Sequence, residues 1–179
     1  MIFFKRPFYW FKHAYQRVKK GYSYRDLWSI DYWFLKTMPN MLEDFTKNLH
    51  GYPTTIKEEL KKKNPELTDE EIDEKNLDFQ HWKDIVKEIA FHFREASEEE
   101  NEAKTNQYWE KMYELEDKYN LFLKNEETIK QTMTKEDFEE WKTNDEKWLD
   151  REKEIENYRN EQLKIGMEMF TKYFWSLWD

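Results

Sequence analysis

The chain has 179 residues, a formal net charge of −9 and no cysteine, and aromatic residues make up 18% of it. This length suits one domain. The absence of cysteine excludes a disulfide framework, thiolate metal sites and a cysteine nucleophile, and it predicts a cytoplasmic setting. Three glycines and four prolines are too few for the many tight turns of a β-rich fold of this size. The composition therefore predicts an all-α fold with an aromatic core.

Charge is divided unevenly along the sequence. Residues 1–25 carry seven basic side chains and no acidic one, and because the total is −9, residues 26–179 carry a net charge of −16. No uninterrupted apolar run approaches the length of a membrane span, and basic residues interrupt the aromatic N-terminus, which argues against a secretory signal. We expect a soluble protein with a basic end and an acidic body.

The first predicted helix covers residues 7–20. Pro7 suits the first helical position, and Gly21 suits the residue after the helix. Apolar side chains step by three or four along one face, which predicts a buried stripe of Phe8, Phe11, Tyr15 and Val18.

A capping pair, Ser23 with Asp26, predicts the start of a second helical segment. Its apolar spacing continues to Leu49 across Pro39, where we expect a kink or a division. The segment 50–53 (HGYP) predicts a stop, followed by a short polar helix. Asp31 lies among apolar neighbours, which predicts pairing with an arginine, Arg25 or Arg94.

A second capping pair, Thr68 with Glu71, predicts a long helix with one aromatic face that ends near Ala96. Beyond it the sequence is acidic with a sparse apolar seam, which is typical of two helices that bury only each other. Residues 163–177 again carry a dense apolar stripe, and the rings on adjacent faces, Tyr173, Trp175 and Trp178, predict a helix nearly surrounded by protein. We therefore expect a helical bundle from residues 1–96 and 161–179, with residues 97–160 as a projecting acidic helical hairpin.

Candidate catalytic and metal sites are weak in this sequence. Asp78 lies three residues before His81, and Glu88, His92 and Glu95 share one face of the same predicted helix. No Glu-x-x-His pair of a di-iron bundle is present. The glycines are isolated, which excludes the usual nucleotide-binding loops. We predict no catalytic residues, no metal site and no cofactor.

The basic, aromatic N-terminus allows three interpretations. Its rings belong to the core while its basic side chains are solvated, or it binds a membrane surface, or it binds nucleic acid through Arg17, Lys19 and Lys20. For a membrane surface, the rings that would face lipid are Phe3, Phe4, Phe8, Trp10 and Phe11. Net acidity of the chain argues against duplex DNA as its main ligand.

The densest acidic cluster comprises Glu98, Glu99, Glu100 and Glu102, and the apolar stripe resumes beyond it at Trp109. These five residues are the predicted contacts with a protein partner. Two alternatives stay open at this point: the run is only a solvated surface, or it mimics nucleic acid in the basic groove of another protein.

Four sequence motifs carry a resemblance to known proteins: YSxxDLWSIDYW at residues 22–33, HGYP at 50–53, FRE at 93–95 and YFWSLWD at 173–179. Together they resemble a family of helical proteins encoded by tailed bacteriophages and prophages. The resemblance implies a phage origin and a setting in the host cytoplasm or the virion, and it implies no catalytic residue.

The leading hypothesis is a phage protein without enzymatic activity that binds a host or phage protein, as an inhibitor or modulator of a host or defence factor. The alternative is a structural or accessory component of the virion that packs as a homo-oligomer through its aromatic ends. Binding of nucleic acid through the N-terminus is the third hypothesis, and contact with a membrane surface ranks with it.

Overall fold

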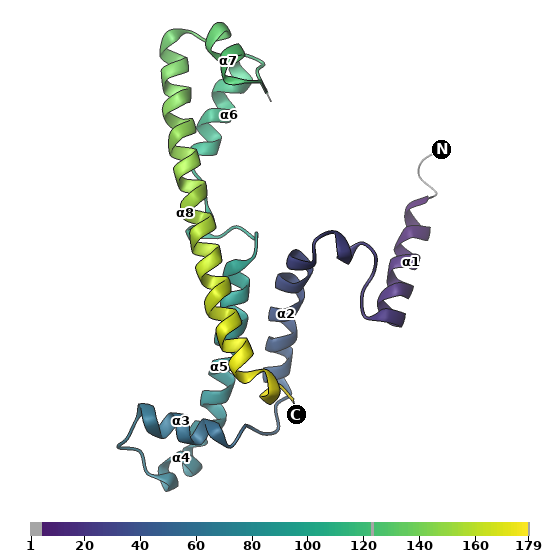
Figure 1. The fold of residues 1–179 in the computed structure, drawn as a ribbon, viewed down its shortest axis with the longest axis vertical. Helices are drawn as coiled ribbons and strands as arrows, with labels where there is room; N and C mark the ends of the chain where they lie inside the picture. Colours follow the sequence, from purple (N-terminus) through teal and green to yellow (C-terminus); the bar gives the residue numbers. More distant parts are fainter. Residues whose placement is uncertain (1–4, 123, 179) are drawn as a thin grey trace. The chain divides into compact units, whose positions relative to one another are not determined.

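The structure is a computed structural model that describes residues 5–122 and 124–178, with side chains from residue 9 onward. Phe3, Phe4, Phe8 as a side chain, and Asp179 of the last motif lie outside what it describes. All regular secondary structure in the described residues is helical, which confirms the predicted all-α fold (Figure 1). The α-helices are α1 (Lys5–Lys20), α2 (Ile30–Lys47), α3 (Thr55–Lys63), α4 (Asp69–Lys75), α5 (Leu77–Ala96), α6 (Tyr108–Lys118), α7 (Glu126–Thr132) and α8 (Lys135–Tyr173). Short 3₁₀ helices are η1 (Asp26–Trp28), η2 (Glu102–Lys104) and η3 (Phe174–Ser176).

The chain forms two compact units. Unit 1 comprises Met1–Glu98 and Gln162–Asp179, and unit 2 comprises Glu99–Glu161. Each unit has a hydrophobic core of its own. No helix among the described residues combines the length and the hydropathy that a membrane crossing requires.

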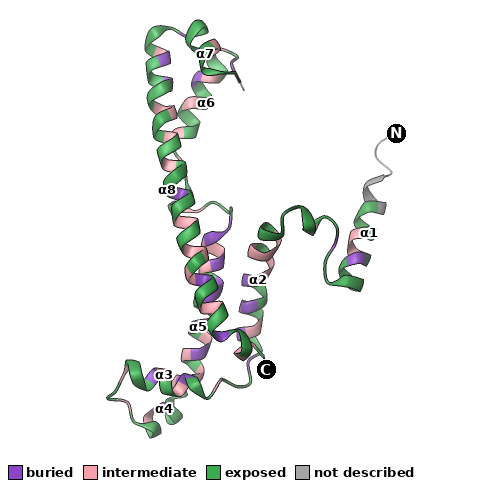
Figure 2. Cartoon of the chain, viewed as in Figure 1, coloured by how far each residue is buried: buried purple, intermediate pink, exposed green. Residues whose placement is uncertain are grey.

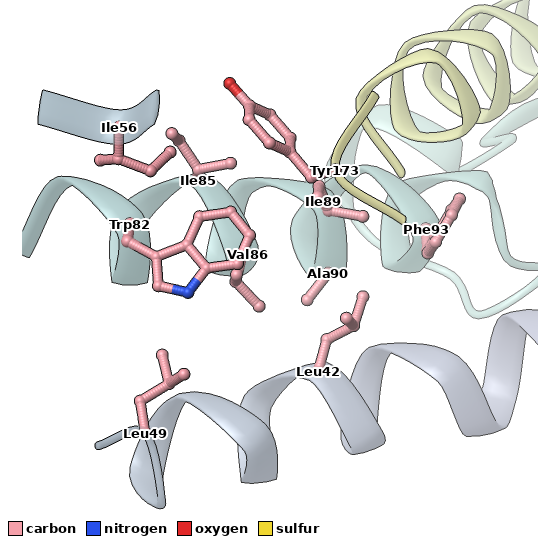
Figure 3. Close-up of a cluster of buried hydrophobic side chains, with 10 residues drawn as sticks. All are labelled: Leu42, Leu49, Ile56, Trp82, Ile85, Val86, Ile89, Ala90, Phe93 and Tyr173. Carbon is pink, nitrogen blue, oxygen red and sulfur yellow. The ribbon is translucent and has the colours of Figure 1, made fainter. Parts of the chain in front are cut away.

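Helix α5 lies at the centre of unit 1 (Figure 3). Its side chains Trp82, Val86, Ile89 and Phe93 are fully or almost fully buried, at the helical spacing that the sequence predicts. Figure 3 shows Leu42 of α2 and Leu49, two residues after the end of α2, facing this helix, with Ile56 of α3 and Tyr173 of α8 nearby; all four are buried. Burial of such large side chains stabilises the fold by about 1.5–3 kcal/mol each, which makes this cluster the main source of stability in unit 1.

The predicted helix over residues 68–96 is divided in two near its N-terminal end. Thr68 and Glu71 form the predicted capping box, in which each side chain bonds the other residue's backbone N–H. Asn76 then adopts the left-handed conformation, with φ of 49°, and separates α4 from α5. Asparagine tolerates this conformation better than most residues, which explains a break that the apolar spacing does not reveal.

Helix α2 runs through Pro39 without a division, and the proline itself is buried. Asp31 in its first turn is exposed, so its carboxylate stays hydrated and needs no buried partner. The predicted pairing with Arg94 is wrong, because the Arg94 guanidinium bonds Glu43 at 2.7 Å and Asn40 at 2.9 Å instead.

Unit 2 has a small core formed by α6, α7 and the first turns of α8. Its buried side chains are Leu115, Leu121, Ile129, Met133, Phe138 and Trp141. The Trp141 indole N–H donates to Glu116 at 3.1 Å, and the Thr134 hydroxyl caps the start of α8 by accepting from the Asp137 N–H. Three helical segments therefore form this unit, where the sequence predicts a simple two-helix hairpin.

The apolar stripe of α1 is not in the core. Phe11 and Tyr15 are each 64% exposed and Val18 is 88% exposed, and Figure 2 colours most of this helix as exposed. The prediction that these three side chains are buried is therefore wrong. The spacing correctly predicts a helix with an apolar face, but spacing alone does not say what covers that face.

Gly166 allows α8 to approach α5 closely. A Cβ atom added at this position would lie 2.9 Å from the Phe93 ring and 3.2 Å from the Cβ of His92. Because Phe93 is fully buried, its ring has little room to move. We predict that Gly166→Ala lowers the free energy of unfolding by about 1–3 kcal/mol, despite the better helix propensity of alanine. Urea denaturation followed by far-UV circular dichroism measures the change.

Gly51→Ala is the matched control, because a Cβ at Gly51 meets no atom within 4 Å and its φ is not in the left-handed region. We expect this variant to stay within about 0.5 kcal/mol of the wild type. Equal stability of the two variants would contradict a close contact at Gly166.

Candidate functional site

An apolar groove lies beside the end of α8 in unit 1. Its volume is about 440 Å³. Helix α2 provides one side of the groove with Met38, Met41 and Phe45. The C-terminal residues provide the other side with Phe174, Trp175 and Trp178. Among the described residues, no charged side chain lines the groove. A concave, aromatic-lined surface of this kind suits an apolar group of a partner or ligand.

The 3₁₀ helix η3 turns the last aromatic rings outward. Helix α8 ends at Tyr173, which is buried, and the tighter turn of η3 follows directly. After this change of register, Trp175 is 86% exposed and Trp178 is 75% exposed. The prediction that these rings are nearly surrounded by protein is wrong, because it assumes that the α-helical stripe continues past Tyr173.

A series of ring contacts joins this exposed surface to the core. Phe93 contacts Phe170 with ring centroids 5.7 Å apart, Phe170 contacts Phe174 at 5.4 Å, and Phe174 contacts Trp175 at 5.2 Å. All three contacts are edge-to-face, the arrangement that aromatic pairs favour. The exposed Trp175 is therefore held in place by rings whose other end is buried.

Trp178 also lines a second pocket of about 440 Å³ on the same unit. The other lining residues include Gly51, Tyr52, Pro53 and Ser176, with Trp82 of α5. The segments HGYP and YFWSLWD, which are more than a hundred residues apart in sequence, thus meet at one site. Their shared location explains why both segments combine aromatic rings with turn residues.

A polar contact fixes the end of α8 beside these pockets. The Tyr173 hydroxyl donates to the Glu59 carboxylate at 2.7 Å, and the Lys172 ammonium donates to the same oxygen at 3.0 Å. Burial of Glu59 works to raise its pKa, but the bonds from Tyr173 and Lys172 outweigh this effect and leave the pKa below its usual value. Glu59 is therefore a carboxylate at neutral pH and anchors α8 to α3.

The predicted acidic contact residues lie in the loop after α5 and in η2. Glu98, Glu99, Glu100 and Glu102 are all exposed. Glu98 belongs to unit 1, whereas the other three belong to unit 2. Ser97 and Lys104, at the two ends of this run, are buried. A row of exposed carboxylates does not by itself form a site.

Trp109, the fifth predicted contact, lies at the start of α6 in unit 2. It packs on Tyr113 with ring centroids 5.0 Å apart, and both line a pocket of about 250 Å³ together with Phe122 and Trp148. The lining is mostly apolar. The structure thus groups Trp109 with other rings and not with the acidic residues.

The predicted basic residues occupy the last turn of α1. Arg17 forms a two-point contact with Asp26, with distances of 2.6 and 3.1 Å from its guanidinium nitrogens to the two carboxylate oxygens. Hydrogen bonding from Arg17 holds the pKa of Asp26 well below its usual range. Lys20 lies over the Tyr24 ring at 4.7 Å, and Lys19 is exposed. Arg17 therefore joins α1 to η1, while Lys19 faces solvent.

The residues considered for metal binding do not form a cluster. Asp78 is buried and accepts a bond from the N–H of Phe79 at 2.8 Å. Burial lowers the pKa of His81, with Lys63 adding to the effect. Across residues 5–122 and 124–178 no three His, Asp or Glu side chains are arranged to hold a metal ion.

The groove residues were not predicted as a site, although a sequence signal exists. YFWSLWD places aromatic rings at four of seven positions, more than one helical face can bury. Met41, beside the buried Leu42 on α2, carries no such signal in the sequence, and only the structure shows that it is exposed. Excess rings near the end of an apolar stripe indicate an exposed patch that needs an explanation.

Comparison with known proteins gives no match: no family model, curated protein or solved structure is similar to this chain at a significant level. The geometry of the two units is therefore the basis for any functional proposal.

The contact between Glu59 and Tyr173 predicts a pH-dependent contribution to stability. The pKa of Glu59 is lower in the folded state than in the unfolded state. The contribution of this carboxylate to the free energy of unfolding is therefore complete above the unfolded pKa of about 4.3, and it is lost as the pH falls through the folded-state pKa. We predict that Glu59→Gln costs about 1 kcal/mol at neutral pH and less in acid. Urea denaturation at both pH values measures the difference.

Glu58→Gln makes the same chemical change at the exposed neighbouring position of α3 and serves as the control. We expect it to have little effect at either pH. A cost for Glu59→Gln that is the same in acid as at neutral pH would show that the charge of Glu59 does not matter.

Proposed function

We propose that this chain is a phage-encoded protein that acts by binding another protein, and that its main contact is the groove beside Trp175 and Trp178. The partner is a host or phage protein, and the consequence of binding is inhibition or modulation of a host or defence factor. The motifs quoted above support the phage origin.

One observation carries the proposal: two tryptophans that line an apolar groove of about 440 Å³, Trp175 and Trp178, are largely exposed. Tryptophan is the residue most enriched among the side chains that dominate binding energy at protein interfaces. Such rings in water are unfavourable unless a partner covers them. The ring contacts that connect Trp175 to Phe93 reduce the entropy lost when a partner binds.

The groove supports a protein partner better than the acidic run does. Exposed glutamates are hydrated and give little binding energy, whereas burial of apolar rings gives most of it. The acidic residues still affect the rate of association with a basic partner, because the net charge of the chain attracts one at low salt.

A virion component remains the alternative proposal. The same groove would then pack against another copy of the chain or another particle protein, as the apolar cores of obligate interfaces do. The two proposals differ in where the chain is found, because only a virion component copurifies with assembled particles in fixed proportion.

We predict that Trp175→Ala combined with Trp178→Ala abolishes binding of the partner. Loss of two anchor rings costs about 2 kcal/mol or more, which weakens binding by at least about thirtyfold. The measurement is quantitative mass spectrometry of proteins retained from host lysate by the tagged full-length chain, followed by titration of the purified partner.

Trp109→Ala is the control, because it removes an exposed ring from unit 2 and leaves the groove unchanged. We expect it to retain the partner as the wild type does. Identical recovery of all proteins by the wild type and the double variant would contradict the proposal. Detection of the chain in purified particles would favour the virion alternative.

A further inference from the structure

Helix α1 presents an apolar face that no described residue covers. Phe11, Tyr15 and Val18 follow each other at spacings of four and three, which places them on one face, and all three are exposed. Trp10 at the edge of this face is also exposed. A helix of this length is only marginally stable in water without tertiary contacts. The exposed stripe therefore indicates that α1 binds a further surface, which covers the stripe and stabilises the helix.

All charged residues of α1 are basic. The helix contains no acidic residue, and its last turn alone carries Arg17, Lys19 and Lys20. Lys12 and Lys19 are three residues before and four residues after Tyr15, which puts them on one edge of the apolar stripe. Along the stripe of Phe11, Tyr15 and Val18 the charges thus flank the apolar side chains, whereas Trp10, seven residues before Arg17, lies on the same side of the helix as that arginine.

This segregation distinguishes between possible occupants of the apolar face. A second α1 would bring two rows of lysines together, which is unfavourable. A single-stranded nucleic acid needs rings and positive charges on the same face, because the bases stack where the backbone is neutralised. A bilayer with anionic lipids accepts both faces at once, with rings at the boundary of headgroups and acyl chains and lysines at the phosphates.

The junction after α1 keeps the helix in a fixed relation to η1. Gly21 adopts φ of +79° and its N–H bonds the Arg17 carbonyl at 2.8 Å, which ends the helix. The ion pair from Arg17 to Asp26 and the bond from the Tyr24 N–H to Gln16 then connect the two elements. Trp28 of η1 is 90% exposed. Tryptophan and tyrosine are the rings that favour the membrane interface.

We propose that α1 is an interfacial helix that docks on the surface of an anionic lipid bilayer. Phe11, Tyr15 and Val18 enter the headgroup region, and Lys12 and Lys19 contact lipid phosphates. This proposal goes beyond partner binding by the groove and depends on different residues. The two contacts together would position the bound partner at a membrane.

Flotation of the full-length chain with lipid vesicles tests the proposal. Vesicles of phosphatidylcholine alone are compared with vesicles that also contain phosphatidylglycerol, at low and at high salt. We expect binding to the anionic vesicles only, weakened by salt, because the lysines contribute through charge. Equal binding to both vesicle types, or binding to neither at saturating lipid, would overturn the proposal.

Two variants separate the apolar contribution from the charge. Phe11→Ser with Val18→Ser removes apolar surface from exposed positions, and we expect vesicle binding to fall by at least about tenfold while the far-UV spectrum keeps its helical form. Lys12→Glu with Lys19→Glu should abolish the preference for anionic lipid. Trp175→Ala with Trp178→Ala is the control and should bind vesicles as the wild type does.

Two other results would assign α1 to a different occupant and overturn the proposal. A concentration-dependent dimer that Phe11→Ser with Val18→Ser dissociates, measured by light scattering without lipid, would identify a second copy. Salt-dependent binding of an oligonucleotide in the absence of lipid, lost in both the serine and the lysine variants, would identify nucleic acid.

Discussion

Unit 1 depends on the burial of one face of α5. Trp82, Val86 and Phe93 have almost no exposed surface, and the segments that cover them come from α2, α3 and the end of α8. Because Phe93 lies against Gly166, the same side chain that closes the core also sets how closely α8 can approach. The groove is a result of this packing: once Phe170 and Tyr173 are placed in the core, the rings that follow Tyr173 in sequence have no core left to fill and lie at the surface.

Local signals in the sequence predicted much of the fold. Thr68 caps its helix as expected, and Gly21 ends α1 with the expected positive φ. The division at Asn76 was not predicted, because asparagine adopts both helical and left-handed conformations and the choice depends on packing. The exposure of Trp175 was not predicted either, since hydrophobicity indicates which rings favour burial and not whether the fold has room for them. The groove therefore required knowledge of the tertiary contacts.

Charge and apolar surface are combined differently at the two candidate surfaces. As far as residue 178, the last that the structure describes, the lining of the groove has rings and no charged side chain, which favours a contact that excludes water. Helix α1 has rings flanked by lysines, which favours a contact with an anionic, partly hydrated layer. Arg17 belongs to neither contact, because its guanidinium is bound to Asp26 and maintains the junction on which the orientation of α1 depends.

The bond from Tyr173 to Glu59 joins residues 114 positions apart in the sequence. Unit 1 is therefore assembled from two segments, with the whole of unit 2 between them. During synthesis, the core around α5 stays incomplete until the last turns of α8 have left the ribosome, because Phe170 and Tyr173 are part of it. Until then the apolar sides of α2 and α5 remain exposed to water and prone to aggregation. A prematurely terminated chain would therefore be a substrate for chaperones and proteases.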